Sequence, residues 1–186
     1  VNTQYAGNTV GLKKLALRLC VNQGAKEGHL CEHMFIAGIR GPGGRVTYVT
    51  GAFPAGTGKT STAMVADLLV SDDLAIVYAS KGVARAINPE VGSFGIIDGV
   101  NPEDDKEIYD ILLDPETEVI FSNILLTDDG EPWWRGRPEP PRPGINYAGR
   151  WPPEGTGADS EQPSLPNARF TTYLRYFKNL DPKIDD

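Results

Sequence analysis

The pattern of hydrophobic and polar positions predicts helices that alternate with short strands. Residues 45–50 are β-branched and roughly alternating, which favours a strand, whereas residues 60–69 are helix formers without Gly or Pro. The glycine-rich turn at 41–44 predicts that the strands on its two sides run antiparallel. Gly28 is expected to end the first helix. The other expected elements are helices at 12–27 and 106–113, and strands at 34–39, 75–78, 83–87 and 119–124.

A glycine-rich segment, 51–60, lies between the expected strand at 45–50 and the expected helix that follows. Backbone N–H groups of such a turn bind phosphate, Lys59 adds positive charge, and the Thr60 hydroxyl can reach a phosphate-bound metal. The segment therefore predicts a nucleoside triphosphate ligand, with an ordinary glycine-rich turn as the alternative. Phe53 stands where the common Gly-x4-Gly-Lys-Ser/Thr pattern has a glycine, so the loop is a variant. The expected nucleotide contacts are Ala55, Gly56, Thr57, Gly58, Lys59 and Thr60.

Two acidic residues, Asp72 and Asp73, follow the apolar run 68–70 and precede the expected strand at 75–78. A carboxylate at this position can hold a divalent cation that neutralises charge on a transferred phosphoryl group. The alternative is a turn or a solvated cap. Because the phosphate-binding loop lies upstream, we interpret the pair as metal-associated.

The segment 132–166 differs from the rest of the chain in composition. It contains nine of the fifteen prolines and all three tryptophans. This composition predicts an extended loop with little regular structure. A packed surface excursion is the favoured interpretation, and a partner-binding segment is the alternative.

The chain has 186 residues, enough for one domain with a substantial core. Its formal net charge of −7 argues against nonspecific binding to nucleic acid or to an anionic membrane. No apolar stretch approaches the length of a membrane span, and we expect a cytoplasmic protein. Cys20 and Cys31 have neither the spacing of a metal site nor the density of a disulfide scaffold, so both are expected to be reduced and buried.

Seven short motifs, in order along the chain, carry a resemblance to one enzyme family. They are Tyr5-Ala6-Gly7-Asn8, Lys13-Lys14 with Ala16-Leu17-Arg18, Glu32-His33-Met34, Phe53-Pro54 with Gly58-Lys59-Thr60, Asp72-Asp73, Arg85-Ala86-Ile87-Asn88-Pro89-Glu90 and Pro166-Asn167-Ala168-Arg169-Phe170. With these motifs the chain resembles GTP-dependent phosphoenolpyruvate carboxykinase.

The resemblance implies an enzyme of gluconeogenesis, a carboxy-lyase that decarboxylates oxaloacetate and phosphorylates the resulting enolate with GTP. The products are phosphoenolpyruvate, GDP and CO2. It also implies an α/β fold in which a mixed sheet carries a P-loop-type mononucleotide-binding core. Residues 1–186 would form one partial nucleotide- and metal-binding domain, with 132–166 as a loop within it.

The resemblance further implies a catalytic Mn2+ ion bound by Lys14, His33 and Asp73. Thr60 resembles the ligand of a Mg2+ or Mn2+ ion that accompanies GTP, and Lys59 resembles the lysine that stabilises the transferring phosphoryl group. Lys14 can ligate only when neutral, and a nearby dication with Lys13 as a like-charged neighbour would favour that form.

The remaining implied roles concern the substrate. Arg85 and Arg169 resemble arginines that bind the carboxylates of oxaloacetate or phosphoenolpyruvate. Arginine suits this role, since a guanidinium binds a carboxylate bidentately. Asn167 is a neighbouring donor. Tyr5, with Gly7 beside it, resembles the tyrosine whose ring edge approaches the substrate carboxylate.

The chain departs from the family pattern in its loop, where Ala55-Gly56-Thr57 replaces Ser-Ala-Cys, and in its length. The family protein is much longer, and its guanine-binding segment has no counterpart here, so we interpret the chain as a fragment. GTP, ATP and pyrophosphate therefore stay open as phosphoryl donors, as does the oligomeric state. The alternatives to a carboxykinase are a nucleotide- and metal-binding module without turnover and a small P-loop kinase or NTPase.

Overall fold

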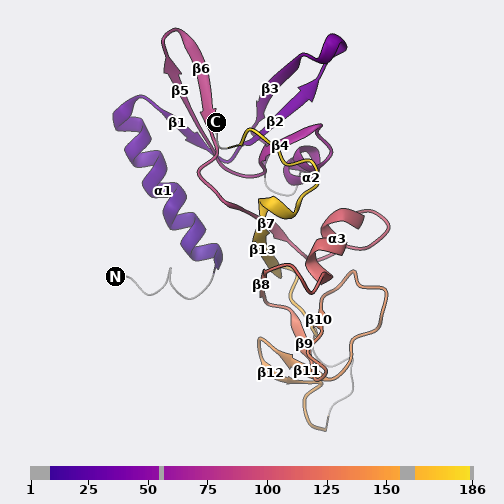
Figure 1. Ribbon diagram of the computed structural model, residues 1–186. Helices are drawn as coiled ribbons and strands as arrows, with labels where there is room; N and C mark the ends of the chain where they lie inside the picture. Colours follow the sequence, from indigo (N-terminus) through magenta and orange to yellow (C-terminus); the bar gives the residue numbers. More distant parts are fainter. Residues whose placement is uncertain (1–8, 55–56, 156–161, 185–186) are drawn as a thin grey trace. The chain divides into compact units, whose positions relative to one another are not determined.

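The computed structural model describes residues 9–54, 57–155 and 162–184, and its chain divides into two compact units (Figure 1). The first unit comprises the N-terminal part of the chain up to Ser93 together with the C-terminal residues from Phe177 onward. The second unit comprises Phe94–Tyr176. Both contain helices and strands, so the α/β character expected from the sequence is confirmed. The prediction of one partial domain over 1–186 stays a prediction, because compactness does not decide whether the units fold together.

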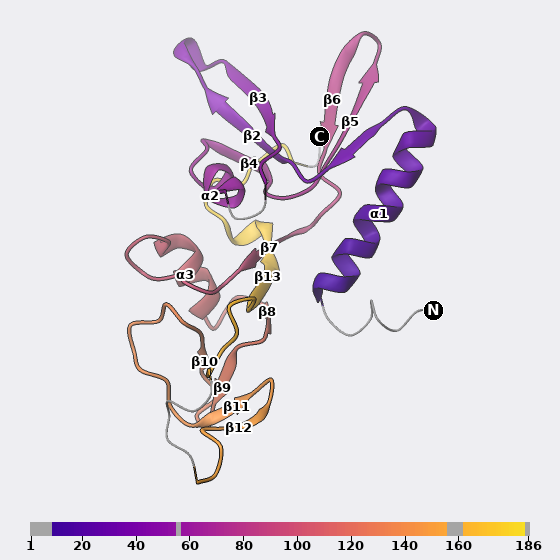
Figure 2. The same ribbon diagram turned by 180° about the vertical axis from the view of Figure 1, so that it is seen from behind.

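Among its described residues, the first unit contains two α-helices and two three-stranded sheets, with strand orders β3-β2-β4 and β1-β5-β6 (Figures 1 and 2). The described pairings within both sheets are antiparallel, so two small sheets replace the one mixed sheet expected here. A 3-10 turn at Pro42–Gly44 connects β2 to β3. The elements are α1 (Thr9–Glu27), β1 (Leu30–Glu32), β2 (Phe35–Arg40), β3 (Val46–Gly51), α2 (Lys59–Met64), β4 (Leu68–Ser71), β5 (Ala75–Ser80) and β6 (Val83–Ile87).

Glycine ends the first helix, as predicted. Gly28 has φ +74°, a left-handed conformation that glycine adopts without steric cost. The N–H of His29 donates to the carbonyl oxygen of Gly24 at 2.8 Å, which satisfies one of the last carbonyls of α1. The turn between β2 and β3 also contains glycines in the left-handed conformation, since Gly43 and Gly44 have φ of +73° and +79°. The predicted antiparallel hairpin is confirmed.

The predicted helix over 60–69 is shorter than expected. Its last residue is Met64, and Leu68–Ser71 form β4. The reason is tertiary: β4 pairs with β2, and the N–H and carbonyl of Leu69 bond to the Asn179 carbonyl at 2.7 Å and the Asp181 N–H at 2.8 Å. These backbone partners lie far away in sequence. They outweigh a local helix propensity of less than about 1 kcal/mol per residue.

The second unit has a core built on aromatic residues. Trp134 is fully buried there, between the rings of Tyr109 and Phe121. Its indole Nε1–H donates to the Val100 carbonyl oxygen at 2.9 Å, so the one polar group of the side chain is satisfied. The buried members of this aromatic core are Ile97, Val100, Leu112, Trp134, Ala168 and Phe170.

In the described residues, the strands of the second unit form two sheets, with strand orders β7-β13-β8 and β10-β9-β11-β12. The helix predicted at 106–113 is confirmed at those residues. The described residues of segment 132–166, which was predicted as an extended loop with little regular structure, contain three short strands of two or three residues each. The elements are β7 (Gly92–Ile96), which begins at the boundary between the units, α3 (Lys106–Leu113), β8 (Val119–Ser122), β9 (Leu125–Thr127), β10 (Pro132–Trp133), β11 (Gly144–Asn146), β12 (Gly149–Trp151), β13 (Arg169–Tyr173) and a 3-10 turn at Leu174–Tyr176.

Two expectations from composition can be compared with the structure. Both cysteines are free; Cys31 is buried as expected, whereas Cys20 is half-buried. Burial, together with the neighbouring Cys20 thiol, raises the pKa of Cys31 to about 11. Among the helices that the structure describes, none is both long enough and apolar enough to cross a bilayer.

Candidate functional site

The glycine-rich segment connects β3 to α2, in the strand–loop–helix order that the sequence predicted (Figure 1). Gly58 directly precedes α2 with φ +91°, a left-handed conformation that favours glycine. Thr57 closes the turn before it: its Oγ1 hydroxyl donates to the Pro54 carbonyl oxygen at 2.6 Å. Ala55 and Gly56 lie outside the described residues. The described ends of the segment thus bring Lys59 and Thr60 to the first turn of α2.

Lys59 connects this loop to the two acids that follow β4. Its Nζ donates to the backbone carbonyl of Asp72 at 2.9 Å and forms an ion pair with the carboxylate of Asp73. The Lys59 side chain is only 11% exposed. An ammonium group with so little access to water requires anionic or carbonyl partners, and both come from the turn after β4.

A second lysine, Lys13 of α1, also contacts Asp73. Its Nζ lies 2.5 Å from Asp73 Oδ2 and 2.9 Å from Glu90 Oε1. The side chains of Lys13, Asp73 and Glu90 are 12%, 16% and 17% exposed. Lys13, Lys59, Asp73 and Glu90 therefore form one partly buried group of two cations and two carboxylates, the lysine–acid cluster.

The cluster determines the charge of Asp73. Burial alone would raise the pKa of this carboxyl group, but the ammonium groups of Lys13 and Lys59 outweigh burial and lower the pKa below its usual value. Asp73 is therefore a carboxylate at neutral pH. A permanently charged carboxylate is the form that a divalent cation requires.

The neighbouring Asp72 has the opposite environment. Its side chain is fully buried, and the Ser93 hydroxyl donates to Oδ2 at 2.8 Å. Burial raises the pKa of Asp72 to about 6, even though Lys13 and Ser93 oppose the shift. Within the described part of the chain, its Oδ1 atom has no hydrogen-bond donor. A buried carboxylate oxygen in this position fits a nearby cation.

The three predicted Mn2+ ligands come from different elements of the first unit. Asp73 is in the turn after β4, Lys14 is exposed on α1, and His33 is exposed between β1 and β2. Helix α1 packs against β1, but the observed contacts join Asp73 to Lys13 and Lys59. No group of three or more His, Cys, Asp or Glu side chains in the described residues is arranged as a metal site. The predicted set combines one His, one Asp and one Lys, and its convergence on one ion stays a prediction.

The nitrogen and oxygen donors of this predicted set nevertheless fit a divalent cation such as Mn2+. Thr60, predicted to contact a nucleotide-bound cation, follows Lys59 in α2 and is half-buried.

The predicted substrate residues lie in both units. Arg85 is exposed on β6, opposite Tyr78 of β5. In the second unit, Asn167 is exposed and accepts a hydrogen bond from Asn123 Nδ2 at 3.3 Å, and the Arg169 guanidinium on β13 lies 5.7 Å from the centre of the Phe94 ring. Tyr5 and Gly7 lie outside the described residues. The roles of all five residues remain predictions.

Sequence reasoning missed the contacts of Lys13, Glu90 and Ser93. It treated Lys13 as a like-charged neighbour of Lys14, although adjacent residues on a helix point about 100° apart and only one of them can face the acids. Glu90 is the last residue of a motif that carries the family resemblance, but the sequence analysis gave it no role. A Ser twenty residues after an Asp pair carries no signal in a single sequence.

Comparisons with known proteins agree with the motif order. Residues 29–186 match the family described as the phosphoenolpyruvate carboxykinase C-terminal P-loop domain. The chain is 53% identical over 188 residues to phosphoenolpyruvate carboxykinase (GTP) of Sulfurisphaera tokodaii, covering 100% of this chain and 30% of the relative. It is 50% identical over 187 residues to the protein of the same name from Saccharolobus solfataricus, an alignment that covers 100% of this chain and 30% of the relative. It is also 50% identical over 184 residues to the protein of the same name from Pyrococcus horikoshii, which covers 97% of this chain and 29% of that relative.

The chain spans about 30% of the length of these curated relatives. The family match begins after α1, extends through the rest of both compact units, and includes the loop, the acids after β4, Arg85, Asn167 and Arg169. The chain therefore belongs to the family of the phosphoenolpyruvate carboxykinase C-terminal P-loop domain.

Proposed function

We propose that this chain is the nucleotide- and metal-binding part of a GTP-dependent phosphoenolpyruvate carboxykinase, acting in the cytoplasm. The enzyme would convert oxaloacetate and GTP into phosphoenolpyruvate, GDP and CO2. The observation that carries the proposal is the lysine–acid cluster. It joins the lysine of the glycine-rich loop to the acidic turn after β4, in a chain whose relatives carry that enzyme's name. A P-loop-type nucleotide-binding core is the finer description of the first unit that this proposal requires.

Each side chain has a chemical task that suits its environment. The Lys59 ammonium is little exposed, so its charge is weakly screened and can stabilise negative charge on a transferring phosphoryl group. Backbone N–H groups around Gly58 and the first turn of α2 would bind the phosphates. Asp73, Lys14 and His33 would hold a Mn2+ ion, and Thr60 a nucleotide-bound Mg2+ or Mn2+ ion. A bound ion would supply a Lewis acid that stabilises enolate and phosphate oxygens.

Arg85, Arg169, Asn167, Tyr5 and Gly7 would bind oxaloacetate or phosphoenolpyruvate. A guanidinium binds a carboxylate with two parallel hydrogen bonds, which would orient the substrate. Orientation matters in this reaction, because phosphoryl transfer depends mostly on positioning and on electrostatic stabilisation.

Lys59→Ala tests the proposal in the complete enzyme that contains this chain. We expect a loss of phosphoenolpyruvate formation of at least about 100-fold, the range found when one electrostatic donor to a transition state is removed. Lys26→Ala is the matched control, because Lys26 is an exposed lysine in the last turn of α1. Wild-type turnover by Lys59→Ala would reject the assignment.

The phosphoryl donor can be measured in the same assay. GTP should support turnover, and ATP and pyrophosphate should not. Turnover with ATP or pyrophosphate in place of GTP would keep the reaction class and change the donor. Hydrolysis of nucleotide without any phosphoenolpyruvate would favour the P-loop NTPase alternative, and nucleotide binding without turnover would favour the binding module.

A further inference from the structure

Glu90 is the one member of the lysine–acid cluster to which neither the sequence motifs nor the family resemblance gives a role. Its carboxylate forms an ion pair with Lys13 Nζ at 2.9 Å, and its side chain is as little exposed as that of Asp73. A carboxylate with so little access to water is costly unless it neutralises a charge or positions a neighbouring group.

The position of Glu90 is fixed by the residue two places before it. The Glu90 N–H donates to Asn88 Oδ1 at 2.8 Å, and Asn88 Nδ2 donates to the Val70 carbonyl oxygen at 2.7 Å. Val70 belongs to β4, the strand that leads directly into Asp73. Asp73 and Glu90 are thus both anchored to β4, and Lys13 spans the space between the two carboxylates.

The charges within the cluster show what Glu90 adds. Asp73 has two cationic neighbours, Lys13 and Lys59. If Asp73 also binds a metal ion, as the proposed function requires, its oxygens can no longer serve both lysines fully. Glu90 also contacts Lys13 and can keep the ammonium in place while Asp73 turns toward the metal ion.

We propose that Glu90 is a positioning residue: it holds the Lys13 ammonium beside Asp73, so that Lys13 keeps its place when Asp73 binds a metal ion. This inference rests on the proposed function, because it takes Asp73 to be a metal ligand. It assigns Glu90 no contact with substrate or metal.

Two substitutions separate position from charge. Glu90→Asp keeps the negative charge but shortens the side chain by one methylene, which moves the carboxylate away from Lys13. Glu90→Gln keeps the length and an acceptor oxygen but removes the charge. If Glu90 positions Lys13, the Asp variant should be the more damaged of the two. If Glu90 supplies only negative charge, the Gln variant should be the more damaged.

The first measurement is the rate at which acetic anhydride labels each lysine of the chain, followed by mass spectrometry. Lys13 should react more slowly than the exposed Lys14, which serves as an internal reference in the same molecule. Glu90→Asp should accelerate Lys13 labelling about tenfold, as expected for loss of a charge-assisted hydrogen bond. Glu90→Gln should accelerate it less, and the thermal unfolding midpoint of the variants should stay close to that of the wild type.

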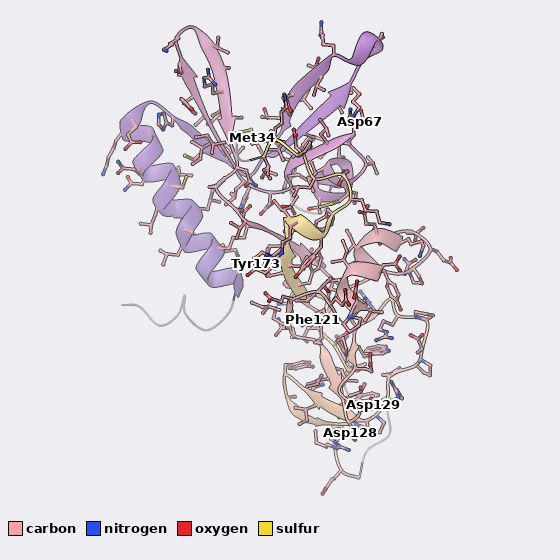
Figure 3. All side chains as sticks on the ribbon, viewed as in Figure 1. Met34, Asp67, Phe121, Asp128, Asp129 and Tyr173 are labelled. Atoms are coloured by element: carbon pink, nitrogen blue, oxygen red, sulfur yellow. The ribbon has the colours of Figure 1, made fainter. Side chains whose placement is uncertain are left out.

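The second measurement is Mn2+ affinity, determined from the electron paramagnetic resonance signal of free Mn2+. Glu90→Asp should weaken binding about tenfold, the scale found when a residue that orients a metal ligand is changed. Asp73→Asn should abolish this binding, and Asp67→Asn, an exposed aspartate at the start of β4 (Figure 3), should leave it unchanged.

The outcomes separate the two proposals. Unchanged Lys13 labelling in both Glu90 variants, or faster labelling in Glu90→Gln than in Glu90→Asp, would overturn the inference and leave the proposed function intact. Failure of the wild-type chain to bind Mn2+, or unchanged binding in Asp73→Asn, would overturn the metal assignment of Asp73 and the inference with it.

Discussion

The two units place charged residues in opposite ways. The first unit holds two lysines and two carboxylates in a little-exposed cluster, with a fully buried Asp72 beside it. The second unit fills its interior with the aromatic core around Trp134, and each ion pair among its described residues has at least one exposed partner, as in Arg150–Asp128. Buried charges are costly to desolvate, whereas buried aromatic rings stabilise a fold. The difference indicates that the first unit carries the cost of buried charges, whereas the second gains stability from its aromatic core.

Two ion pairs of the second unit have similar surroundings. Arg150 donates to Asp128 at 2.7 Å, Arg142 pairs with Asp129, and Figure 3 labels both aspartates in the turn that follows β9. The Arg150 guanidinium lowers the pKa of Asp128. Both partners of each pair are about half exposed, so water screens the attraction between them.

The largest expected effect breaks the aromatic core. Trp134→Ala removes a fully buried indole and leaves the Val100 carbonyl without its donor, so it should lower the free energy of unfolding by about 3–5 kcal/mol. Urea unfolding followed by circular dichroism measures this loss. Trp133→Ala is the control, because Trp133 is only half-buried. Equal losses in the two variants would contradict a scaffold centred on Trp134.

The second-largest expected effect is a gain in stability, and it comes from replacing Asp72 in the first unit. The folded protein releases the Asp72 proton near pH 6, whereas the unfolded chain releases it near pH 4. Between these values the folded state binds more protons, so the contribution of Asp72 to stability falls as the pH rises. Asp72→Asn keeps an acceptor for Ser93 and removes this dependence.

At pH 8 the Asp72→Asn variant should therefore be more stable than the wild type by about 2–3 kcal/mol, and the difference should vanish near pH 4. Chemical unfolding of both proteins across this pH range measures it. A variant that is less stable than the wild type at pH 8 would mean that the Asp72 carboxylate is stabilised in the fold, contrary to the cost of its burial.

The smallest expected effect concerns the surface. Arg150→Ala removes one partner of an exposed ion pair and should leave the thermal unfolding midpoint unchanged within error, at low and at high salt. A salt-sensitive drop as large as that of Trp134→Ala would show that the surface pairs support the second unit, and the contrast between the units would fail.

Local sequence determined those features that depend on near neighbours. The helix at 106–113, the end of the first helix at Gly28 and the β2–β3 hairpin follow from periodicity and from glycine conformations, so they were predicted correctly. The family was expected from a resemblance carried by seven short motifs, and the comparisons confirm it. The strand–loop–helix order around 51–60 was predicted for the same reason.

Tertiary structure decided the features that depend on distant partners. Leu68–Ser71 became a strand because β2 and the C-terminal residues pair with it, although the local sequence favours a helix. Lys13, and not Lys14, meets Asp73, because the packing of α1 selects which helix face points inward. Glu90 and Ser93 gain their partners in the same way. The energy of a buried charge depends on which groups surround it, and residues far apart in sequence supply those groups only once the chain has folded.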